Sequence, residues 1–305
     1  MAEEFNHTRL LSLKFPENIF TYTERDAALY ALGVGACGND ALETDDLKYV
    51  YHENEQRFIQ ILPTFSSVFT GDSVLEELHL PGLEYDPKLL LHGQQYIEIY
   101  RPLPPSASVK NVKSLAGLHD KGKSAIVEVE VQSFDVMSDE LLCMNRFTLY
   151  LRGAGGFSKS SPPYSYTSYT NKVAAVKIPK SQPTAVYEDR THSSQALLYR
   201  LSGDYNPIHS DPKIANLAGY PRPILHGLCT LGYAARAVAK CICVGDAGMI
   251  KNISARFLLH VFPGETLVTE MWLQGSRVVY QTSVQERRKP VLSGYIDILP
   301  LSSSL

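Results

Sequence analysis

The chain contains 305 residues, of which 44% are hydrophobic and 20% are charged, proportions typical of a globular protein with about two domains. The 29 Lys and Arg residues nearly balance the 32 Asp and Glu residues, giving a net charge of -3. This balance disfavours binding to nucleic acid or to an anionic membrane surface. The sequence also lacks an apolar run as long as a membrane span, so we expect no membrane insertion.

Five cysteines are spread along the chain as Cys37, Cys143, Cys229, Cys241 and Cys243. Their number is odd, no Cys-x-x-Cys pair occurs, and the spacing of the last two does not match common zinc sites. The cysteines are therefore predicted to be reduced core residues of an intracellular protein, without a metal site.

Residues 18 to about 151 form the first predicted unit. The sequence Thr23-Glu24-Arg25-Asp26 indicates a helix start, and the helix is expected to end at Gly33. Alternation of polar and apolar residues predicts strands farther along, at residues 95–100, 126–131 and 144–151.

A segment rich in Gly, Ser and Pro separates the two predicted units. Gly153-Ala154-Gly155-Gly156 lacks the strand, helix and Gly-Lys-Ser/Thr context of a phosphate loop, and Pro162-Pro163 follows it. We interpret this segment as an interdomain connection that does not contribute to a core. The predicted division is residues 1–152 for the first domain, 153–176 for the connection and 177–305 for the second domain.

The second predicted unit is built around one long helix that begins at Gly227. Apolar residues with gaps of three and four mark one face of this helix. They are Leu228, Leu231, Ala235, Val238 and Ile242. Strands are expected next, at about residues 253–262, 266–273, 277–285 and 291–298. Because a long apolar helix precedes an antiparallel meander, we expect an α+β fold in which a sheet curls around a central helix.

The two units contain similar short segments. Leu29-Tyr30-Ala31-Leu32 is similar to Leu198-Tyr199-Arg200-Leu201, and Leu91-His92-Gly93 is similar to Leu225-His226-Gly227. The first unit has no counterpart of the Asp and His that follow in the second. We therefore predict two copies of one fold, of which only the second carries the chemistry.

Residues 199–212 combine an acid, an amide and an imidazole with residues that force turns. Pro207 favours an extended conformation at Asn206, so a loop can bring the neighbouring polar side chains together. If Asp204 and His209 share a water, they can add or remove water by general acid and base catalysis. In the alternative interpretation, this stretch is a turn whose side chains bond only their own backbone.

His226 and Gly227 lie where the long helix is expected to begin. The first amides of a helix are unpaired and carry the positive end of the helix dipole, so the Gly227 N–H can stabilise a negative oxygen. For His226 two interpretations stay open, a contact with substrate or a buried histidine bonded to a carbonyl.

The stretch Tyr199–His209, together with Pro223–Thr230 around His226 and Gly227, resembles the hydratase 2 family of (3R)-specific enoyl-CoA hydratases. These enzymes are MaoC-like double hot-dog proteins. Further similar segments extend the resemblance over nearly the whole chain. They are Tyr22–Asp26, Tyr30–Ala36, Leu91–Tyr96, Pro263–Leu267 and Thr269–Trp272. The resemblance implies two tandem hot-dog units, each an antiparallel sheet wrapped around a long helix.

The resemblance also implies a reaction, the reversible hydration of a trans-2-enoyl-CoA to a (3R)-3-hydroxyacyl-CoA in peroxisomal beta-oxidation, without a metal or other cofactor. Asp204 and His209 match the pair that activates water in the family. Asn206 matches a residue that holds this loop, and Gly227 matches the amide that polarises the thioester carbonyl.

Contacts to the acyl-CoA substrate follow from the same resemblance. The expected substrate-binding residues are His92, Gly93, Lys121, Phe257, Tyr205 and His226. Among them, Lys121 is expected near a phosphate of CoA. An acidic residue of the family's first domain falls near Glu53.

The last three residues, Ser303, Ser304 and Leu305, resemble the Ser-Lys-Leu peroxisomal address with Ser in place of Lys. They predict a peroxisomal location and recognition by the peroxisomal import receptor. The alternative is a polar tail without a targeting role. The family likeness further implies a homodimer of the two-unit chain.

Two other functions are compatible with the sequence. Acyl-CoA thioesterases share the hot-dog architecture, and a fold alone does not fix a function. A non-catalytic acyl-CoA binding protein is the alternative from a different class. Release of free CoA thiol would indicate the thioesterase, and binding without turnover would indicate the binding protein.

Overall fold

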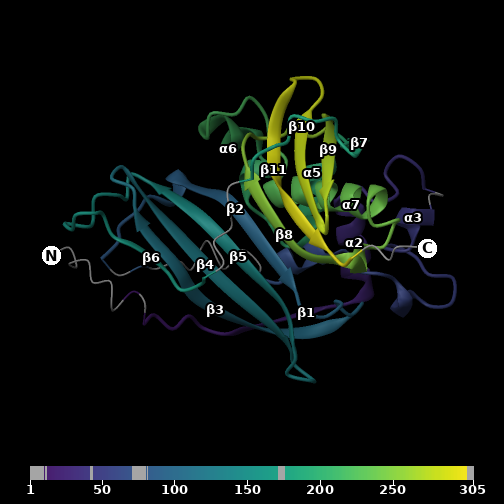
Figure 1. The fold of residues 1–305 in the computed structure, drawn as a ribbon, viewed down its shortest axis with the longest axis horizontal. Helices are drawn as coiled ribbons and strands as arrows, with labels where there is room; N and C mark the ends of the chain where they lie inside the picture. Colours follow the sequence, from purple (N-terminus) through teal and green to yellow (C-terminus); the bar gives the residue numbers. More distant parts are fainter. Residues whose placement is uncertain are drawn as a thin grey trace.

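The computed structural model describes residues 10, 12–41, 44–70, 80, 82–170 and 176–300. The predicted targeting residues Ser303, Ser304 and Leu305 lie outside these ranges. Within the described ranges, no helix has the length and apolar character needed to cross a membrane. Figure 1 shows the strands of the N-terminal half on the left and those of the C-terminal half at the upper right.

The helices and strands divide between two halves of the chain. The N-terminal half contains β1 (Asn18–Tyr22), α2 (Glu24–Gly33), α3 (Thr44–Leu47), η1 (Gln56–Phe58), η2 (Pro63–Val68), η3 (Pro87–Leu89), β2 (Leu90–Ile99), β3 (Ala107–Asp120), β4 (Ser124–Asp135), β5 (Leu141–Arg152) and β6 (Ser165–Thr167). The C-terminal half contains β7 (Ala185–Arg190), α5 (Gln195–Tyr199), η4 (Arg200–Ser202), η5 (Pro207–His209), α6 (Pro212–Leu217), α7 (Gly227–Cys241), η6 (Ala247–Met249), β8 (Ile250–Phe257), β9 (Thr266–Gln274), β10 (Arg277–Val284) and β11 (Lys289–Ile298).

One 11-stranded sheet passes through both halves in the order β1-β3-β4-β5-β2-β8-β11-β10-β9-β7, with β6 paired to β3. The halves join where β2 pairs antiparallel with β8, in a register that sets Tyr96 opposite Ser254. Outward from this junction, the order β2-β5-β4-β3-β1 corresponds strand by strand to β8-β11-β10-β9-β7. The structure therefore confirms two copies of one fold.

Helix α7 is the centre of the C-terminal half. Its predicted apolar stripe is present, since Leu231, Ala235 and Val238 are each at most 1% exposed. The helix contacts each of the strands β7 to β11 and lies along the inner side of their sheet (Figure 1). The predicted arrangement of a sheet curled around a helix is confirmed for this half.

The N-terminal half has no helix as long as α7 among its described residues. Its α2 begins at a capping box made by Thr23 and Asp26, as the sequence indicated. Between α2 and β2, where the C-terminal half has α7 between α5 and β8, the described residues form α3 and the 3-10 helices η1, η2 and η3, of which the six-residue η2 is the longest.

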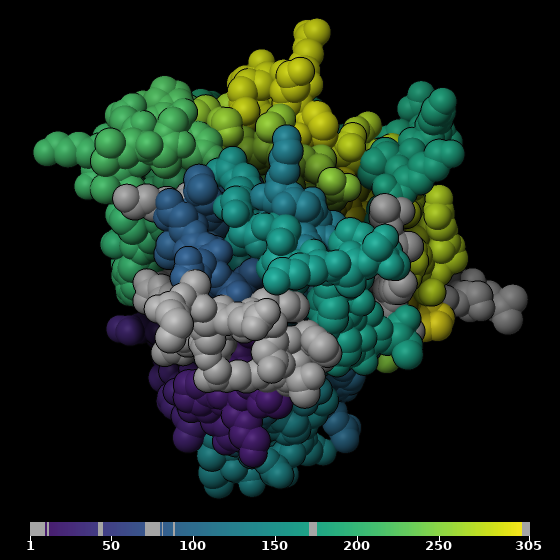
Figure 2. All heavy atoms as spheres, turned by 90° about the vertical axis from the view of Figure 1, so that its left-hand side faces the viewer, coloured from purple at the N-terminus to yellow at the C-terminus, as the bar shows by residue number. Residues whose placement is uncertain are grey.

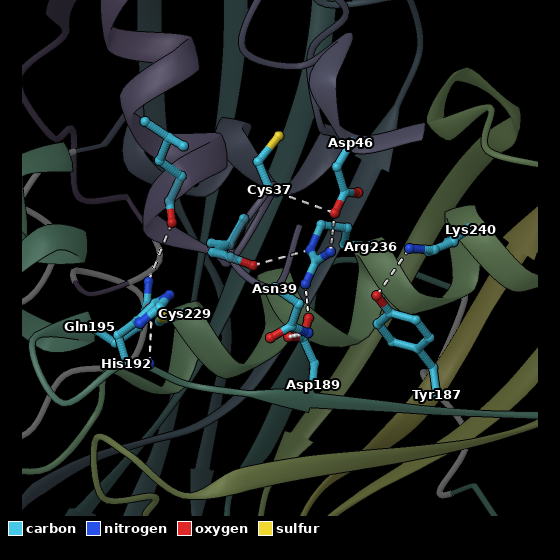
Figure 3. Close-up of polar contacts among 12 residues, drawn as sticks. Cys37, Asn39, Asp46, Tyr187, Asp189, His192, Gln195, Cys229, Arg236 and Lys240 are labelled. Atoms are coloured by element: carbon cyan, nitrogen blue, oxygen red, sulfur yellow. Dashed lines mark hydrogen bonds and ion pairs between the residues drawn. The ribbon is translucent and has the colours of Figure 1, made fainter. Parts of the chain in front are cut away.

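A buried ion cluster ties α7 to the N-terminal half. Arg236 is 2% exposed and forms ion pairs with Asp46, from the N-terminal half, and with Asp189, from β7. Its Nε donates to the carbonyl oxygen of Val34, and the Asn39 amide donates to Asp189 (Figure 3). Because the partners come from both halves, the cluster fixes α7 relative to the chain between α2 and α3.

The segment predicted to connect the units without contributing to a core packs against the N-terminal half. Ala154 is buried in a core cluster of that half, and the Asp120 carboxylate accepts hydrogen bonds from the backbone of Gly156 and Ser158. Residues Ser165–Thr167 pair with β3. The expectation of a segment outside the core is therefore wrong, because its glycines shape a packed turn. The domain division near residue 153 stays a proposal.

Two further predictions are only partly correct. The meander is confirmed for β9, β10 and β11, but β8 lies beside β11 and β2 instead of beside β9. Cys143, Cys229 and Cys243 are buried and unpaired, whereas Cys37 is partly exposed and Cys241 is exposed. The core prediction is therefore wrong for Cys241, which lies at the last position of α7.

The similarity between short segments holds in the fold for one pair only. Helices α2 and α5 follow the corresponding strands β1 and β7, and the rings of Tyr30 and Tyr199 lie 5.9 Å apart. In contrast, His92 lies within β2, whereas His226 precedes α7. The likeness of Leu91-His92-Gly93 to Leu225-His226-Gly227 therefore does not reflect equivalent positions.

Candidate active site

A cavity of about 890 Å³ lies between the two halves. Residues of η5, α7 and β8 line it from the C-terminal half, and residues of η2, β2 and β5 line it from the N-terminal half. In Figure 2, the green surface of the chain near residues 210–220 lies beside the blue surface near residue 90. The cavity volume is in the range typical of small-molecule sites.

Local sequence fixes the shape of the loop that carries Asp204. Gly203 has a φ of +123°, a backbone conformation that favours glycine, and it ends η4. Asn206 caps η5, since its side-chain oxygen accepts a hydrogen bond from the Ile208 N–H at 3.1 Å. The expected turn bonds are thus present, and they hold Asp204 and His209 on the cavity wall.

His209 is held in a defined tautomer. Its Nδ1 lies 2.8 Å from the carbonyl oxygen of Ile224, and a carbonyl only accepts, so Nδ1 carries the hydrogen. The unprotonated nitrogen of the neutral ring is then Nε2. Burial lowers the pKa of His209 below its ordinary value, although the Asp204 charge and the Ile224 hydrogen bond oppose this effect. A neutral imidazole with an available lone pair can accept a proton.

Asp204, His209 and His226 form one cluster, in which one polar atom from each lies within 4.8 Å of the others. His226 Nε2 is 3.2 Å from the backbone oxygen of Asp204 and 3.9 Å from its carboxylate Oδ2. The rings of His209 and His226 stack, with centroids 3.7 Å apart and an angle of 28° between their planes. Because the lone pairs of stacked rings lie in nearly parallel planes, they do not converge on one ion as metal ligands do. The cluster is better suited to proton transfer.

Gly227 is the first residue of α7, so its N–H has no partner within the helix. A Cβ at this position would lie 3.1 Å from the Phe257 ring. Glycine therefore leaves room for a ligand atom to approach the end of the helix, where the helix dipole favours negative charge. Both Gly227 and Phe257 line the cavity.

The N-terminal half contributes an aromatic wall. The His92 ring packs against the rings of Phe147 and Phe257, with centroid distances of 5.4 and 5.0 Å. Burial lowers the pKa of His92 to about 4, so this ring is neutral at neutral pH. Gly93, at a bulge of β2, leaves space that the Tyr150 ring occupies. This wall offers apolar contact and no charged group.

Most of the predicted site residues meet at the cavity. Those that line it are Asp204, Asn206, His209, Gly227, His92, Gly93, Phe257 and Tyr205.

Three other predicted residues do not line this cavity. Lys121 lies in the turn after β3 and lines a separate polar hollow of about 300 Å³. His226 is 1% exposed and lies outside the lining. Glu53 is exposed in the segment between α3 and η1 and does not line the cavity. The structure therefore does not support these residues as contacts to a ligand in this cavity.

Several cavity residues were not predicted from the sequence. Ile224 acts through its backbone oxygen, for which the side chain gives no signal. Phe147 and Tyr150 lie in a strand that alternation predicted, but alternation does not say which strand faces a ligand. Val68 and Thr70 follow a proline that begins η2, and such a proline is a detectable signal of a helix start.

Comparisons with known proteins agree with this architecture. Residues 20–153 match the model of the MFE-2 hydratase 2 N-terminal domain, and residues 174–294 match the model of the MaoC like domain. The chain is 65% identical over 303 residues to the peroxisomal enoyl-CoA hydratase 2 of Arabidopsis thaliana, covering 99% of this chain and 98% of that protein.

Solved structures show the same fold. A MaoC-like dehydratase from Phytophthora capsici superposes with a TM-score of 0.85 at 31% identity, covering 99% of this chain and 100% of that chain. A Mycobacterium tuberculosis protein described as having a double hotdog fold superposes with a TM-score of 0.57 at 12% identity, covering 94% of this chain and 97% of that chain. The predicted α+β double hot-dog fold is confirmed.

Proposed function

Because this chain belongs to the enoyl-CoA hydratase 2 family, we propose that it is a hydro-lyase that reversibly hydrates trans-2-enoyl-CoA to (3R)-3-hydroxyacyl-CoA in peroxisomal beta-oxidation. One observation connects the proposed reaction to particular residues. Asp204 and His209 line the same cavity as Gly227, so an acid/base pair and an amide donor face one ligand. The (3R) configuration rests on the family likeness.

The amide of Gly227 acts on the thioester. A thioester conjugated to a double bond is electrophilic at C3, and attack there moves negative charge onto the thioester oxygen. The Gly227 N–H, at the positive end of the α7 dipole, can donate to this oxygen. Removal of one such donor typically lowers kcat by about 10²- to 10³-fold.

The acid/base pair moves the protons of the added water. Asp204 and the unprotonated Nε2 of His209 hold a water between them. As the water oxygen bonds to C3, the pair takes one proton from it, and the pair then returns a proton to C2. Hydroxyl and hydrogen from water are both added, and Asp204 and His209 recover their starting states. General acid/base catalysis of this kind contributes about 10²- to 10⁴-fold.

The N-terminal half would house the acyl chain. Val68, Leu91 and Phe147 line the cavity from this half. Apolar side chains favour a hydrocarbon chain because its burial removes apolar surface from water. The chain therefore supplies the pocket from one half and the reacting groups from the other.

The protein is peroxisomal, in line with the location that the name of its Arabidopsis relative gives. We propose that Ser303, Ser304 and Leu305 are bound by the peroxisomal import receptor. Deletion of Leu305 should leave a fluorescently tagged protein in the cytosol. Unchanged import of the truncated protein would contradict this role.

The chain is also proposed to form a homodimer. Strands β1 and β7 stand at the two ends of the sheet order, and edge strands present backbone groups that another chain can pair with. Light scattering should give twice the mass of one chain, and a monomer at micromolar concentration would contradict the proposal.

One coupled assay tests the proposed reaction. Hydration consumes the absorbance of the conjugated enoyl thioester without releasing thiol, whereas a thioesterase releases free CoA. The purified protein should show the first signal and not the second. Hydration should also be lost in Asp204→Ala and in His209→Ala. Full activity of both variants would overturn the assignment of the pair.

A further inference from the structure

His226 has contacts that the proposed reaction does not explain. The side chain is 1% exposed and lies outside the cavity lining, so it cannot be a direct contact to the ligand. It nevertheless contacts both members of the acid/base pair, so it can affect the reaction by positioning them.

The first contact is to the backbone of Asp204. His226 Nε2 lies 3.2 Å from the Asp204 carbonyl oxygen. Since a carbonyl only accepts, Nε2 must carry the hydrogen and donate. The bond fixes the backbone of Asp204 directly after Gly203, whose positive φ places it at the turn. It therefore anchors the residue at the point from which the carboxylate extends.

The second contact is to the ring of His209. The two imidazoles stack with centroids 3.7 Å apart, while the Ile224 carbonyl holds Nδ1 of His209 from its edge. The hydrogen bond defines the tautomer, and the stacked face defines the plane of the ring. Together they aim Nε2 of His209.

His226 also remains uncharged beside a ring that must accept a proton. Burial lowers the pKa of His226 well below its ordinary value, and the nearby His209 and Arg200 lower it further. The Tyr199 ring also packs against His226, 4.8 Å away between centroids. A neutral His226 adds no positive charge to oppose protonation of His209.

We infer that His226 is a positioning residue of the hydration reaction, which holds Asp204 through Nε2–H and holds the plane of His209 by stacking. This inference rests on the proposed function. It differs from a substrate-binding role because His226 acts through the pair and touches no ligand.

Two variants separate the two contacts. His226→Gln keeps an N–H donor that can reach the Asp204 carbonyl but removes the stacked ring. His226→Phe keeps a ring to stack but removes the donor. Because small misplacements of reacting groups can cost up to about 10²-fold in rate, each variant should lower kcat about 10- to 100-fold per folded molecule. KM should change by less than about threefold, since ground-state binding is unaffected.

A double variant tests the mechanism of the loss. If His226 acts through Asp204, His226→Phe should lower kcat much less in an Asp204→Asn background than in the native protein. His192→Phe provides a control, because His192 is an exposed histidine that does not line the cavity. Its kcat should match that of the native protein.

The outcomes distinguish the alternatives. Unchanged kcat in both His226 variants, or a raised KM at constant kcat, would overturn the positioning role. Thermal denaturation that shows less folded protein but a native kcat per folded molecule would also overturn it, because only stability would then be affected. If the native protein itself does not hydrate enoyl-CoA, the proposed function fails first, and that result is read in the same assay.

Discussion

The two halves of the molecule share one strand order but use the space beneath the sheet differently. In the C-terminal half, the 15-residue α7 packs under strands β7 to β11 and presents Gly227 at its start. In the N-terminal half, the described residues at the corresponding place in the chain form α3 and the short 3-10 helices η1, η2 and η3, and Val68 of η2 lines the cavity. The C-terminal half therefore supplies the helix start that carries the amide donor, whereas the N-terminal half supplies apolar side chains to the cavity wall.

The halves also differ in the chemistry of their histidines. His209 lies in a cluster with a carboxylate and a second imidazole, and its tautomer is fixed by Ile224. His92 lies between aromatic rings, and its pKa is lowered to about 4 by burial. Only the first environment places a proton donor and acceptor next to each other.

The largest expected effect separates these two histidines directly. His209→Gln should lower kcat for hydration by about 10²- to 10⁴-fold, because it removes a general acid/base group. His92→Phe should keep kcat within about threefold and act mainly on KM, because it changes only binding contact. Steady-state kinetics of the purified variants measure both. A comparable loss of kcat in the two variants would contradict the assignment of catalysis to the C-terminal half and of binding contact to the N-terminal half.

The second effect concerns the contact between the halves. Arg236→Met removes the buried cation that pairs with Asp46 and Asp189, so it should destabilise the protein by about 3–5 kcal/mol. Arg277→Met is the matched control, since Arg277 pairs with Asp297 but its side chain is 45% exposed. The control should cost about 1 kcal/mol or less. Urea unfolding of the variants compares them, and equal losses would argue against the cluster as the tie between halves.

A third change narrows the part of the cavity that Val68 of η2 lines. Val68 is 7% exposed and lines the cavity, so Val68→Phe should obstruct a long acyl chain. KM for a ten-carbon enoyl-CoA should rise about 10-fold or more, with little change for a four-carbon substrate. Val244→Phe, at a site 89% exposed, should change neither. Equal effects on both chain lengths would mean that the acyl chain lies elsewhere.

The smallest effect is a shift in pH dependence. A general base must be unprotonated, and the pKa of His209 lies below the ordinary histidine value of 6.5 because burial disfavours its charged form. Activity should therefore persist at pH 6.5 and fall only as the pH drops below that value. The profile of kcat/KM against pH measures this limb. An acid limb centred above pH 6.5 would contradict the assigned environment.

The parts of the fold governed by local patterns could be predicted from the sequence. The stripe Leu231, Ala235 and Val238 repeats at the helical period and predicted α7, and Thr23 with Asp26 predicted the start of α2. The 3-10 helix η2 was not predicted from a local pattern, since the expectation for this part of the chain came from the family likeness. The position of β8 beside β2 also carries no local signal, since strand pairing depends on contacts distant in the sequence.

The candidate site shows the same division. Asp204, Asn206 and His209 belong to one continuous loop, so a short motif predicted them together. Lys121 and His226 were assigned by resemblance, and the structure puts the first at another hollow and the second outside the cavity lining. Backbone contacts such as that of Ile224 depend on tertiary packing, which no residue type reveals.

The most direct test of the account is chiral analysis of the product formed from a medium-chain trans-2-enoyl-CoA, with Asp204→Asn assayed alongside. The native protein should form the (3R)-hydroxyacyl-CoA, and the variant should form almost none. A (3S) product, no hydroxy product, or an Asp204→Asn variant as active as the native protein would contradict the account.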